Sequence, residues 1–133
     1  RLMDMNQSAM IDESYTTSNI LNALQIDILK MYSLDPHPDS DTLEERMIRG
    51  LAVLSSMPLF VFSNYHHKKI MRYPCPDESF AKNILALIRQ NKDISPQEIQ
   101  AMDTLLVLHA DHGGGNNSTF ANVVISSTGT DIY

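Results

Sequence analysis

A short stretch near the C-terminal end of the sequence carries the side chains best suited to chemistry. His109 and His112 lie three positions apart, with Asp111 between them, directly after an apolar run. In a helix this spacing places two side chains on nearly the same face, so both imidazoles would reach one helix end together. Three glycines (residues 113–115) and the short polar residues Asn116, Asn117 and Ser118 follow.

This order of residue types predicts a binding pocket. Glycines leave backbone amides accessible, and the N-terminus of a following helix favours negative charge. A histidine can donate a hydrogen bond to a carboxylate or polarise a carbonyl, and its reference pKa of about 6.5 makes both charge states reachable near neutral pH. The stretch therefore predicts a site for a small anionic carbonyl compound.

Two other interpretations of the same residues stay open. His109 could be a buried histidine bonded to a carbonyl, with the glycines serving only as a helix C-cap. His109, Asp111 and His112 are also metal-ligand types, which would suit a metal-dependent hydrolase. The metal interpretation is the weaker of the two, because the two-His-plus-Glu helix motif is absent and no further Cys or His lies at ligand spacing.

The elements that position this stretch are predicted to be helices. Apolar residues recur every three or four positions almost throughout, which predicts an all-α fold without internal repeats. A first helix is expected over Asn19–Tyr32, ending before the prolines at 36 and 38. One face of it carries Leu21, Leu24, Ile28 and Met31.

The next region is predicted to hold two helices separated at Pro58. Thr42 and Glu45 form a capping-box pattern that opens the first of them. Pro58 is expected to end or kink it, with Leu59–Met71 forming another helix. In the first helix, the face expected to point to the core carries Leu43, Met47, Leu51 and Leu54, and the face expected to be solvated carries Glu44, Glu45, Arg46 and Arg49.

Three further helices complete the prediction. Glu78–Gln90 is amphipathic, with Phe80, Ile84, Leu87 and Ile88 expected to point inward. Ser95, Pro96 and Glu98 give a strong start signal for a helix whose stripe is Ile99, Met102, Leu106 and His109. Ser118–Ser127 is predicted to be helical despite its β-branched residues, because Phe120, Val123 and Val124 fit helical spacing and Asn116, Asn117 or Ser118 can cap it.

Composition narrows the class of protein. The 133 residues carry 10 basic and 16 acidic side chains, a net charge of −6, which argues against a nucleic-acid or membrane-surface binder. The single cysteine, Cys75, cannot form an internal disulfide, so a reducing, cytoplasmic location is expected. No apolar run approaches the roughly 18 residues of a membrane helix. The start at Arg1 and the end at Tyr133 lead us to expect a piece of a longer protein, truncated at both ends.

The sequence resembles the citrate synthase family. The resemblance rests on Leu-His-Ala-Asp-His at 108–112, the glycines, Asn-x-Ser-Thr-Phe at 116–120 and Ser-Ser-Thr-x-x-Asp-x-Tyr at 126–133, and it extends from about Asn19. It implies that residues 1–133 are part of the multi-helical large domain of a homodimeric enzyme. That enzyme would condense acetyl-CoA, a substrate rather than a cofactor, with oxaloacetate and need no metal.

The resemblance also implies roles for single residues. His112 matches the histidine that hydrogen-bonds oxaloacetate, and Asn116 and Ser118 match polar residues lining the same site. His109 and Asp111 are taken as supporting residues. Gly113 departs from the family, which often has an acidic residue there. The Asn19–Tyr32 helix and the segment from Ser118 are expected near the dimer interface, and self-association is expected.

The catalytic groups that the resemblance implies do not occur in this chain. The family's Gly-Pro-x-His-Gly and Gly-x-Gly-His-Arg motifs are absent from residues 1–133, and the catalytic aspartate and substrate-clamping arginines are likewise not matched. We therefore expect the chain to be inactive alone. His66–Lys69 could attract a CoA phosphate, although a solvated helix face is the simpler interpretation. The alternatives are 2-methylcitrate synthase, which uses propionyl-CoA, and a non-enzymatic helical interaction module.

Overall fold

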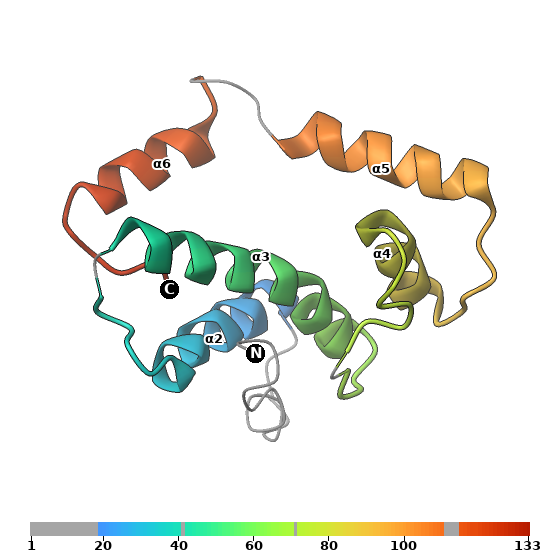
Figure 1. Ribbon diagram of the computed structural model, residues 1–133, viewed down its shortest axis with the longest axis horizontal. Coiled ribbons are helices and arrows are strands. Elements are labelled where there is room, and N and C mark those ends of the chain that lie inside the picture. The colour runs from blue at the N-terminus through green and yellow to red at the C-terminus, as the bar shows by residue number, and fades with distance from the viewer. Residues whose placement is uncertain (1–18, 41, 71, 111–114) are drawn as a thin grey trace. The chain divides into compact units, whose positions relative to one another are not determined.

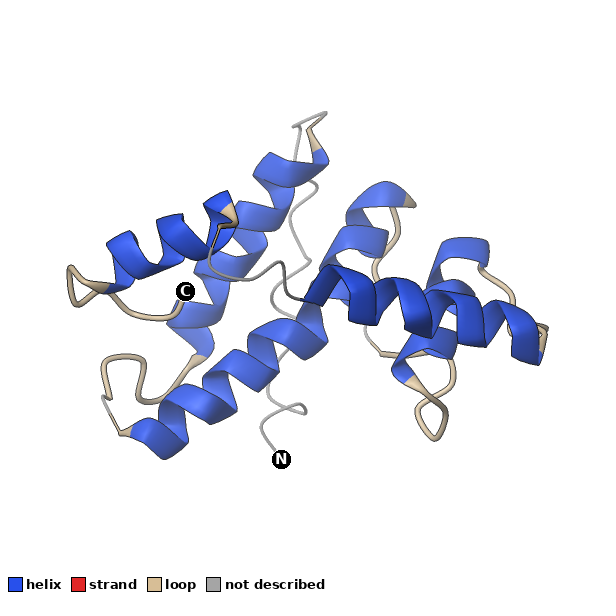
Figure 2. Cartoon of the chain, turned by 90° about the horizontal axis from the view of Figure 1, so that it is seen from above, coloured by secondary structure: helices blue, strands red, loops and turns tan. Residues whose placement is uncertain are grey.

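The computed structural model describes residues 19–40, 42–70, 72–110 and 115–133. Within these ranges the chain forms helices and no strands (Figures 1 and 2). This confirms the predicted all-α class. The described helices are α2 (Ile20–Leu34), α3 (Leu43–Tyr65), α4 (Phe80–Arg89), α5 (Pro96–Ala110) and α6 (Asn117–Ser126).

The chain divides into two compact units. The first comprises Arg1–Tyr73 together with Ile132–Tyr133, and the second comprises Pro74–Asp131. In the first unit α2 packs against α3, and in the second α4 packs against α5. The unit that contains the two predicted histidines is therefore the second.

Helix α2 starts where the sequence predicts. The side chain of Asn19 caps it, because its Oδ1 accepts a hydrogen bond from the backbone N–H of Leu21 at 2.9 Å. The buried positions are Ala23 and Asp27, whereas Leu21 is 68% exposed. The buried face is thus centred on a small residue and an acid, while Leu24, Ile28 and Met31 of the predicted stripe are half-buried.

Helix α3 continues through Pro58, so the prediction of a separate helix over Leu59–Met71 is wrong. Thr42 and Glu45 do form the predicted cap: the N–H of Glu45 donates to Thr42 Oγ1 at 3.3 Å. Pro58 removes one amide donor, but Leu59 and Phe60, directly after it, are both buried. Packing there holds the helix together until His66 caps its end.

The buried face of α3 also differs from the prediction. The residues expected to point to the core are between 61% and 75% exposed, and they are Leu43, Met47, Leu51 and Leu54. Arg49, expected to be solvated, is buried. The serines at 56 and 63 lie on the buried face, and small side chains of this kind allow α2 to approach closely.

Arg49 is buried because its whole guanidinium group is paired. Its Nε donates to Asp35 Oδ2 at 2.7 Å, and the two side chains are 8% and 10% exposed. Its terminal nitrogens donate to the backbone carbonyls of Ser40, at 2.6 Å, and His37. The Tyr133 hydroxyl donates to the same Asp35 oxygen at 2.8 Å. We call Asp35, Arg49 and Tyr133 the polar joint of the first unit.

By length and composition alone, α3 could cross a membrane. It has 23 residues, and its most apolar 18-residue window has a mean hydropathy of 1.3. The expectation that no segment resembles a membrane helix is thus wrong for α3, whose apolar stretch follows charged residues in its first turns. A third of the window (33%) is buried inside the protein, and α3 packs against α2.

In the second unit, the α4–α5 pair encloses a small core. Leu85, Ala86 and Ile94 form it, and Cys75, Ile99 and Met102 pack against it. Ile84 and Leu87 are buried as predicted, but Phe80 and Ile88 are about two-fifths exposed (42% and 40%), so their predicted inward orientation is wrong. The buried Asn83 side chain fixes the preceding loop by bonding both the N–H and the carbonyl of Cys75.

The start of α5 follows the predicted capping box. The Ser95 N–H donates to Glu98 Oε2 at 2.9 Å, and the Glu98 N–H donates to Ser95 Oγ at 3.4 Å. Arg89, at the end of α4, pairs with Glu98 at 2.7 Å. The Arg89 guanidinium and the two bonds from Ser95 lower the pKa of Glu98 to about 2. This cluster joins the end of α4 to the start of α5.

Candidate functional site

His109 lies in the last turn of α5 and faces its own helix. Its Nδ1 lies 2.7 Å from the carbonyl oxygen of Leu105, so Nδ1–H donates to that oxygen. The residue is exposed, whereas Ile99, Met102 and Leu106 of the same predicted stripe are half-buried. His109 is therefore bonded to a carbonyl, as one interpretation expected, but the expected burial of the residue is wrong.

His112 and Asp111 lie outside the described residues, as do Gly113 and Gly114. Their predicted roles stay predictions. Of the predicted site residues, the structure describes His109, Asn116 and Ser118. These three lie on either side of the glycine run, in the same unit of the chain.

Asn116 and Ser118 open helix α6, as the sequence predicts. Asn116 is the N-cap residue, and its Oδ1 accepts a hydrogen bond from the Ser118 N–H at 2.6 Å. Ser118 is exposed and Asn116 half-buried. The amide of Asn116 and the hydroxyl of Ser118 therefore lie together at the start of α6.

The electrostatics of this helix end favour an anion. The first N–H groups of a helix lack partners within the helix, and the helix dipole adds partial positive charge at the same end. No acidic side chain lies in the first turn of α6. A carboxylate could be held by these amides together with Asn116 and Ser118, which is the chemistry predicted for the stretch.

The described residues do not contain three His, Cys, Asp or Glu side chains grouped as a metal site would need. His109, the described member of the predicted triplet, has its Nδ1 bound to a carbonyl. The triplet itself includes two residues outside the described ranges, so the metal interpretation is neither supported nor tested at those positions.

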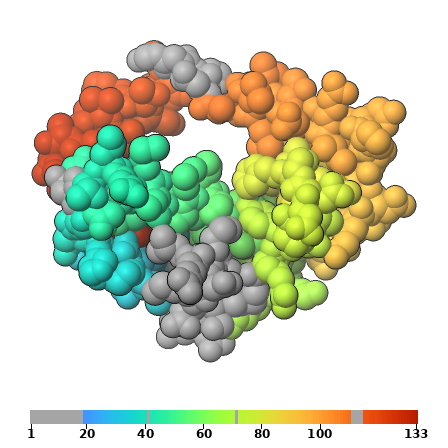
Figure 3. Space-filling model, in the orientation of Figure 1, coloured from blue at the N-terminus to red at the C-terminus, as the bar shows by residue number. Residues whose placement is uncertain are grey.

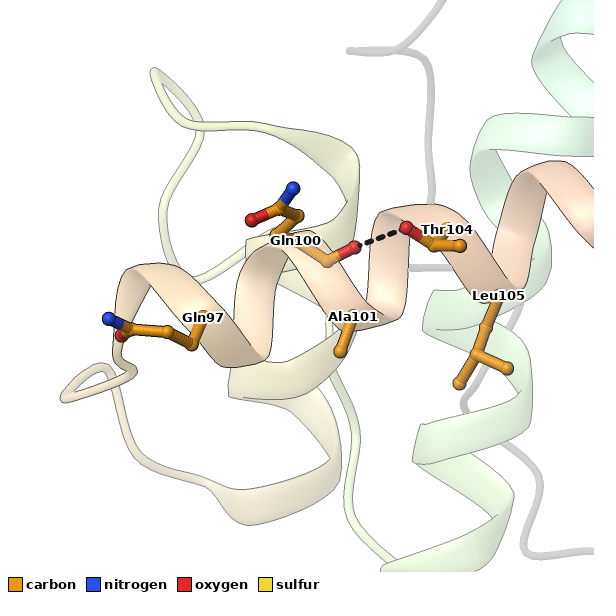
Figure 4. A pocket seen from close by; sticks show the side chains of 5 residues that line it. All are labelled: Gln97, Gln100, Ala101, Thr104 and Leu105. Carbon is orange, nitrogen blue, oxygen red and sulfur yellow. Dashed lines mark hydrogen bonds between the residues drawn. The ribbon is translucent and has the colours of Figure 1, made fainter.

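A shallow hollow of about 540 Å³ lies along one face of α5 (Figure 4). The side chains that line it come from successive turns of the helix, and Thr104 Oγ1 donates to the carbonyl of Gln100 at 2.9 Å. The lining residues are uncharged: Gln97, Gln100, Ala101, Thr104 and Leu105. None of them was predicted as a site residue, and a surface of this kind offers little to bind an anion.

The basic turn after α3 is a solvated surface. His67, Lys68 and Lys69 are exposed, and the Lys68 N–H donates to the Ser63 carbonyl at 3.0 Å. The half-buried His66 ring stacks on Phe62, with centroids 6.2 Å apart. Positive charge is favoured at a helix C-terminus, which accounts for the cluster without a ligand.

Comparison with known proteins identifies relatives along the whole chain. Residues 2–133 match the family model described as citrate synthase, C-terminal domain. The citrate synthase of Deinococcus radiodurans is 32% identical over 85% of this chain and 30% of its own length. The citrate synthase of Haloferax volcanii is also 32% identical, over 84% of this chain and 30% of its own.

A further relative bears a different name. The protein called 2-methylcitrate synthase 1 of Corynebacterium glutamicum is 27% identical over the full length of this chain and 36% of its own. This chain thus spans about a third of the length of the curated relatives that it matches. No solved structure matches significantly.

Proposed function

We propose that this chain, which belongs to the citrate synthase family, forms part of the helical large domain of an enzyme. That enzyme condenses acetyl-CoA with oxaloacetate. The products would be citrate and CoA. The observation that carries the proposal is the family match over residues 2–133, which includes the histidine and glycine stretch. The anion-favouring start of α6 is consistent with a dicarboxylate substrate.

In this proposal the chain supplies the oxaloacetate side of the active site. His112 donates a hydrogen bond to oxaloacetate, while Asn116 and Ser118 line the site, and His109 and Asp111 support it. The groups that remove the methyl proton of acetyl-CoA and stabilise the enolate belong to other parts of the enzyme. The proposal needs no metal or cofactor, and it places the enzyme in the cytoplasm.

The test is release of CoA thiol, measured with a thiol-reactive dye. A complete enzyme that includes residues 1–133 should release CoA from acetyl-CoA only when oxaloacetate is present, and the 133-residue chain alone should release none. Loss of a single oxyanion-type donor costs about 10²–10³ in rate, and here several such groups are missing. Activity of the chain alone at the rate of the complete enzyme would refute the assignment of catalytic groups. Failure of the complete enzyme with every acyl-CoA would refute the function.

A second candidate is 2-methylcitrate synthase, because the relative with that name aligns with the entire chain. The same assay distinguishes the two when propionyl-CoA replaces acetyl-CoA. A higher kcat/KM for propionyl-CoA would assign the chain to 2-methylcitrate synthesis. The oxaloacetate contacts proposed above are common to both reactions.

We also propose that the protein is a homodimer and that α3 contributes to its interface. Part of α3 is open to the surface in the space-filling view (Figure 3). The exposed leucines at 43, 51 and 54 lie on that helix together with Met47. An exposed apolar stripe on one helix is consistent with an interaction surface.

Replacing Leu51, which is 63% exposed, by arginine should weaken self-association of the chain by about tenfold or more. A charge in a packed apolar interface loses its hydration without gaining a partner. Sedimentation velocity over a range of concentrations measures the effect. Glu44→Gln is the matched control, because Glu44 is exposed on the same helix and the substitution changes the net charge equally. If Leu51→Arg and Glu44→Gln associate alike, the stripe is not the interface.

A further inference from the structure

The α2–α3 pair buries one acid without a charged partner among the described residues. Asp27 lies one turn after Ala23 on the face of α2 that packs against α3, and only 3% of it is exposed. Its Oδ2 accepts a hydrogen bond from Asn64 Nδ2 at 2.8 Å. Its Oδ1 is buried, and in the part of the chain that the structure describes it has no hydrogen-bond partner.

Among the described residues, the hydrogen-bond partner of the Asp27 carboxyl group is neutral and shared. Asn64 Nδ2 also donates to the Phe60 carbonyl at 3.0 Å, so the same amide nitrogen serves two acceptors. A buried carboxylate needs a cation or several donors to stay ionised, and otherwise it takes up a proton. Burial raises the pKa of Asp27 above its usual value of 3.8, and the weaker effect of the Asn64 hydrogen bond opposes the rise.

The ionisable groups close to Asp27 and Asn64 in the sequence do not shift the pKa of Asp27. Lys30 lies one turn further along α2, and Tyr65 and His66 follow Asn64 at the end of α3. Burial and the Asn64 bond are the causes of the shifted pKa, and none of these three groups contributes to it.

The opposite end of the same helix pair provides an internal comparison. Asp35 is also largely buried, and burial alone would raise its pKa. Hydrogen bonds from the His37 N–H, Tyr133 and Arg49, together with the charge of Arg49, instead hold the pKa of Asp35 below its usual value. The two aspartates on one helix pair thus differ in whether a cation accompanies the buried carboxyl group.

We propose that the carboxyl group of Asp27 takes up a proton when α2 packs against α3, which couples the packing of these helices to pH. The folded chain then binds this proton more tightly than the unfolded chain. The contribution of Asp27 to stability is therefore most favourable at low pH, falls as the pH rises from about 4 through the folded-state value, and stays lower above it. Deprotonation would loosen the α2–α3 contact first at Asp27 and Asn64.

The test substitutes Asp27 by asparagine, which has the shape of the protonated acid and can still accept from Asn64. Asp27→Asn should melt about 3–6 °C above the parent near pH 7, and the difference should shrink to about 1 °C near pH 4. Asp103→Asn is the control, because Asp103 is exposed on α5 and its removal changes the charge equally. An equal rise of the melting temperature in both variants would overturn the proposal. A lower melting temperature of Asp27→Asn than of the parent at every pH would also overturn it.

A direct measurement does not depend on the variant folding. The side-chain carboxyl carbon of Asp27 in the parent chain can be titrated by carbon-13 NMR. The proposal expects a midpoint above 3.8, the usual value of an aspartate. A midpoint at or below 3.8 would show that the buried carboxyl group stays ionised, and the proposal would then be wrong.

Discussion

Arg49→Met should lower the free energy of unfolding of the chain by about 3–5 kcal/mol, the usual cost of removing one partner from a buried ion pair. The Arg49 and Asp35 side chains are only 8% and 10% exposed. The substitution leaves the Asp35 carboxylate without its cation, and the carbonyls of His37 and Ser40 lose their donors. Chemical denaturation monitored by circular dichroism measures the loss.

The loss of stability in Arg49→Met should be larger near neutral pH than at acidic pH. The pKa of Asp35 is lowered in the folded parent, so the stability gained from its pairing is present above the usual value of 3.8 and disappears as the pH falls below it. In Arg49→Met, Asp35 can protonate and so avoid an unpaired buried charge. The difference between parent and variant should therefore be largest near neutral pH and smaller near pH 4.

Two further variants separate charge from packing. Arg49→Lys keeps the charge but cannot reach all three acceptors, so its loss should be intermediate. Arg46→Met removes an exposed arginine one turn earlier on α3 and should change stability by less than about 1 kcal/mol. Equal losses in Arg49→Met at both pH values would mean that packing, and not the ion pair, stabilises the joint.

The features that sequence predicted well are local. Thr42 with Glu45, and Ser95 with Glu98, are pairs three residues apart whose side chains and backbones bond one another directly. Asn116 at the start of α6 is a cap of the same kind. Because each pattern is complete within four residues, it fixes a helix start without reference to the rest of the fold.

The features that sequence missed depend on distant partners. Periodicity shows that α3 has an apolar stripe, but it does not say which face another helix will cover. The polar joint links Asp35 to Tyr133, 98 residues later, so no local pattern signals that Arg49 will be buried. Pro58 stays within a helix because the residues after it are packed, a tertiary effect that outweighs local preference.

The residues of the candidate site also differ in whether a local sequence pattern could place them. Asn116 and Ser118 could be placed from the sequence because a cap and a first turn are local features. The exposure of His109 could not, because whether a side chain at the end of α5 is covered depends on packing with other elements. The role of His112 comes from the family resemblance alone, since spacing by itself also allowed a metal site or a simple helix end.

His112→Gln should raise the KM for oxaloacetate by about 10–100-fold in the complete enzyme, with a smaller effect on kcat. This prediction depends on the proposed function, in which His112 donates a hydrogen bond to a substrate carboxylate. Such a bond to a charged group contributes about 1.5–3 kcal/mol, which corresponds to that range. Steady-state kinetics with varied oxaloacetate at saturating acetyl-CoA measures it.

His109→Gln is the matched comparison, because the same substitution is made three residues earlier, at a histidine that the proposed function treats as supporting the site and not as a ligand. The Nδ1–H of His109 donates to the Leu105 carbonyl, so this ring is held by its own helix. Its replacement should change the KM for oxaloacetate by less than about threefold, because a neutral side-chain bond within a helix contributes little to ligand binding. If both variants raise the KM for oxaloacetate by the same factor, the kinetics do not distinguish His112 from His109 as the ligand. If His112→Gln leaves the KM unchanged, the imidazole does not contact the substrate, and Asn116, Ser118 and the amides of α6 would have to bind it alone.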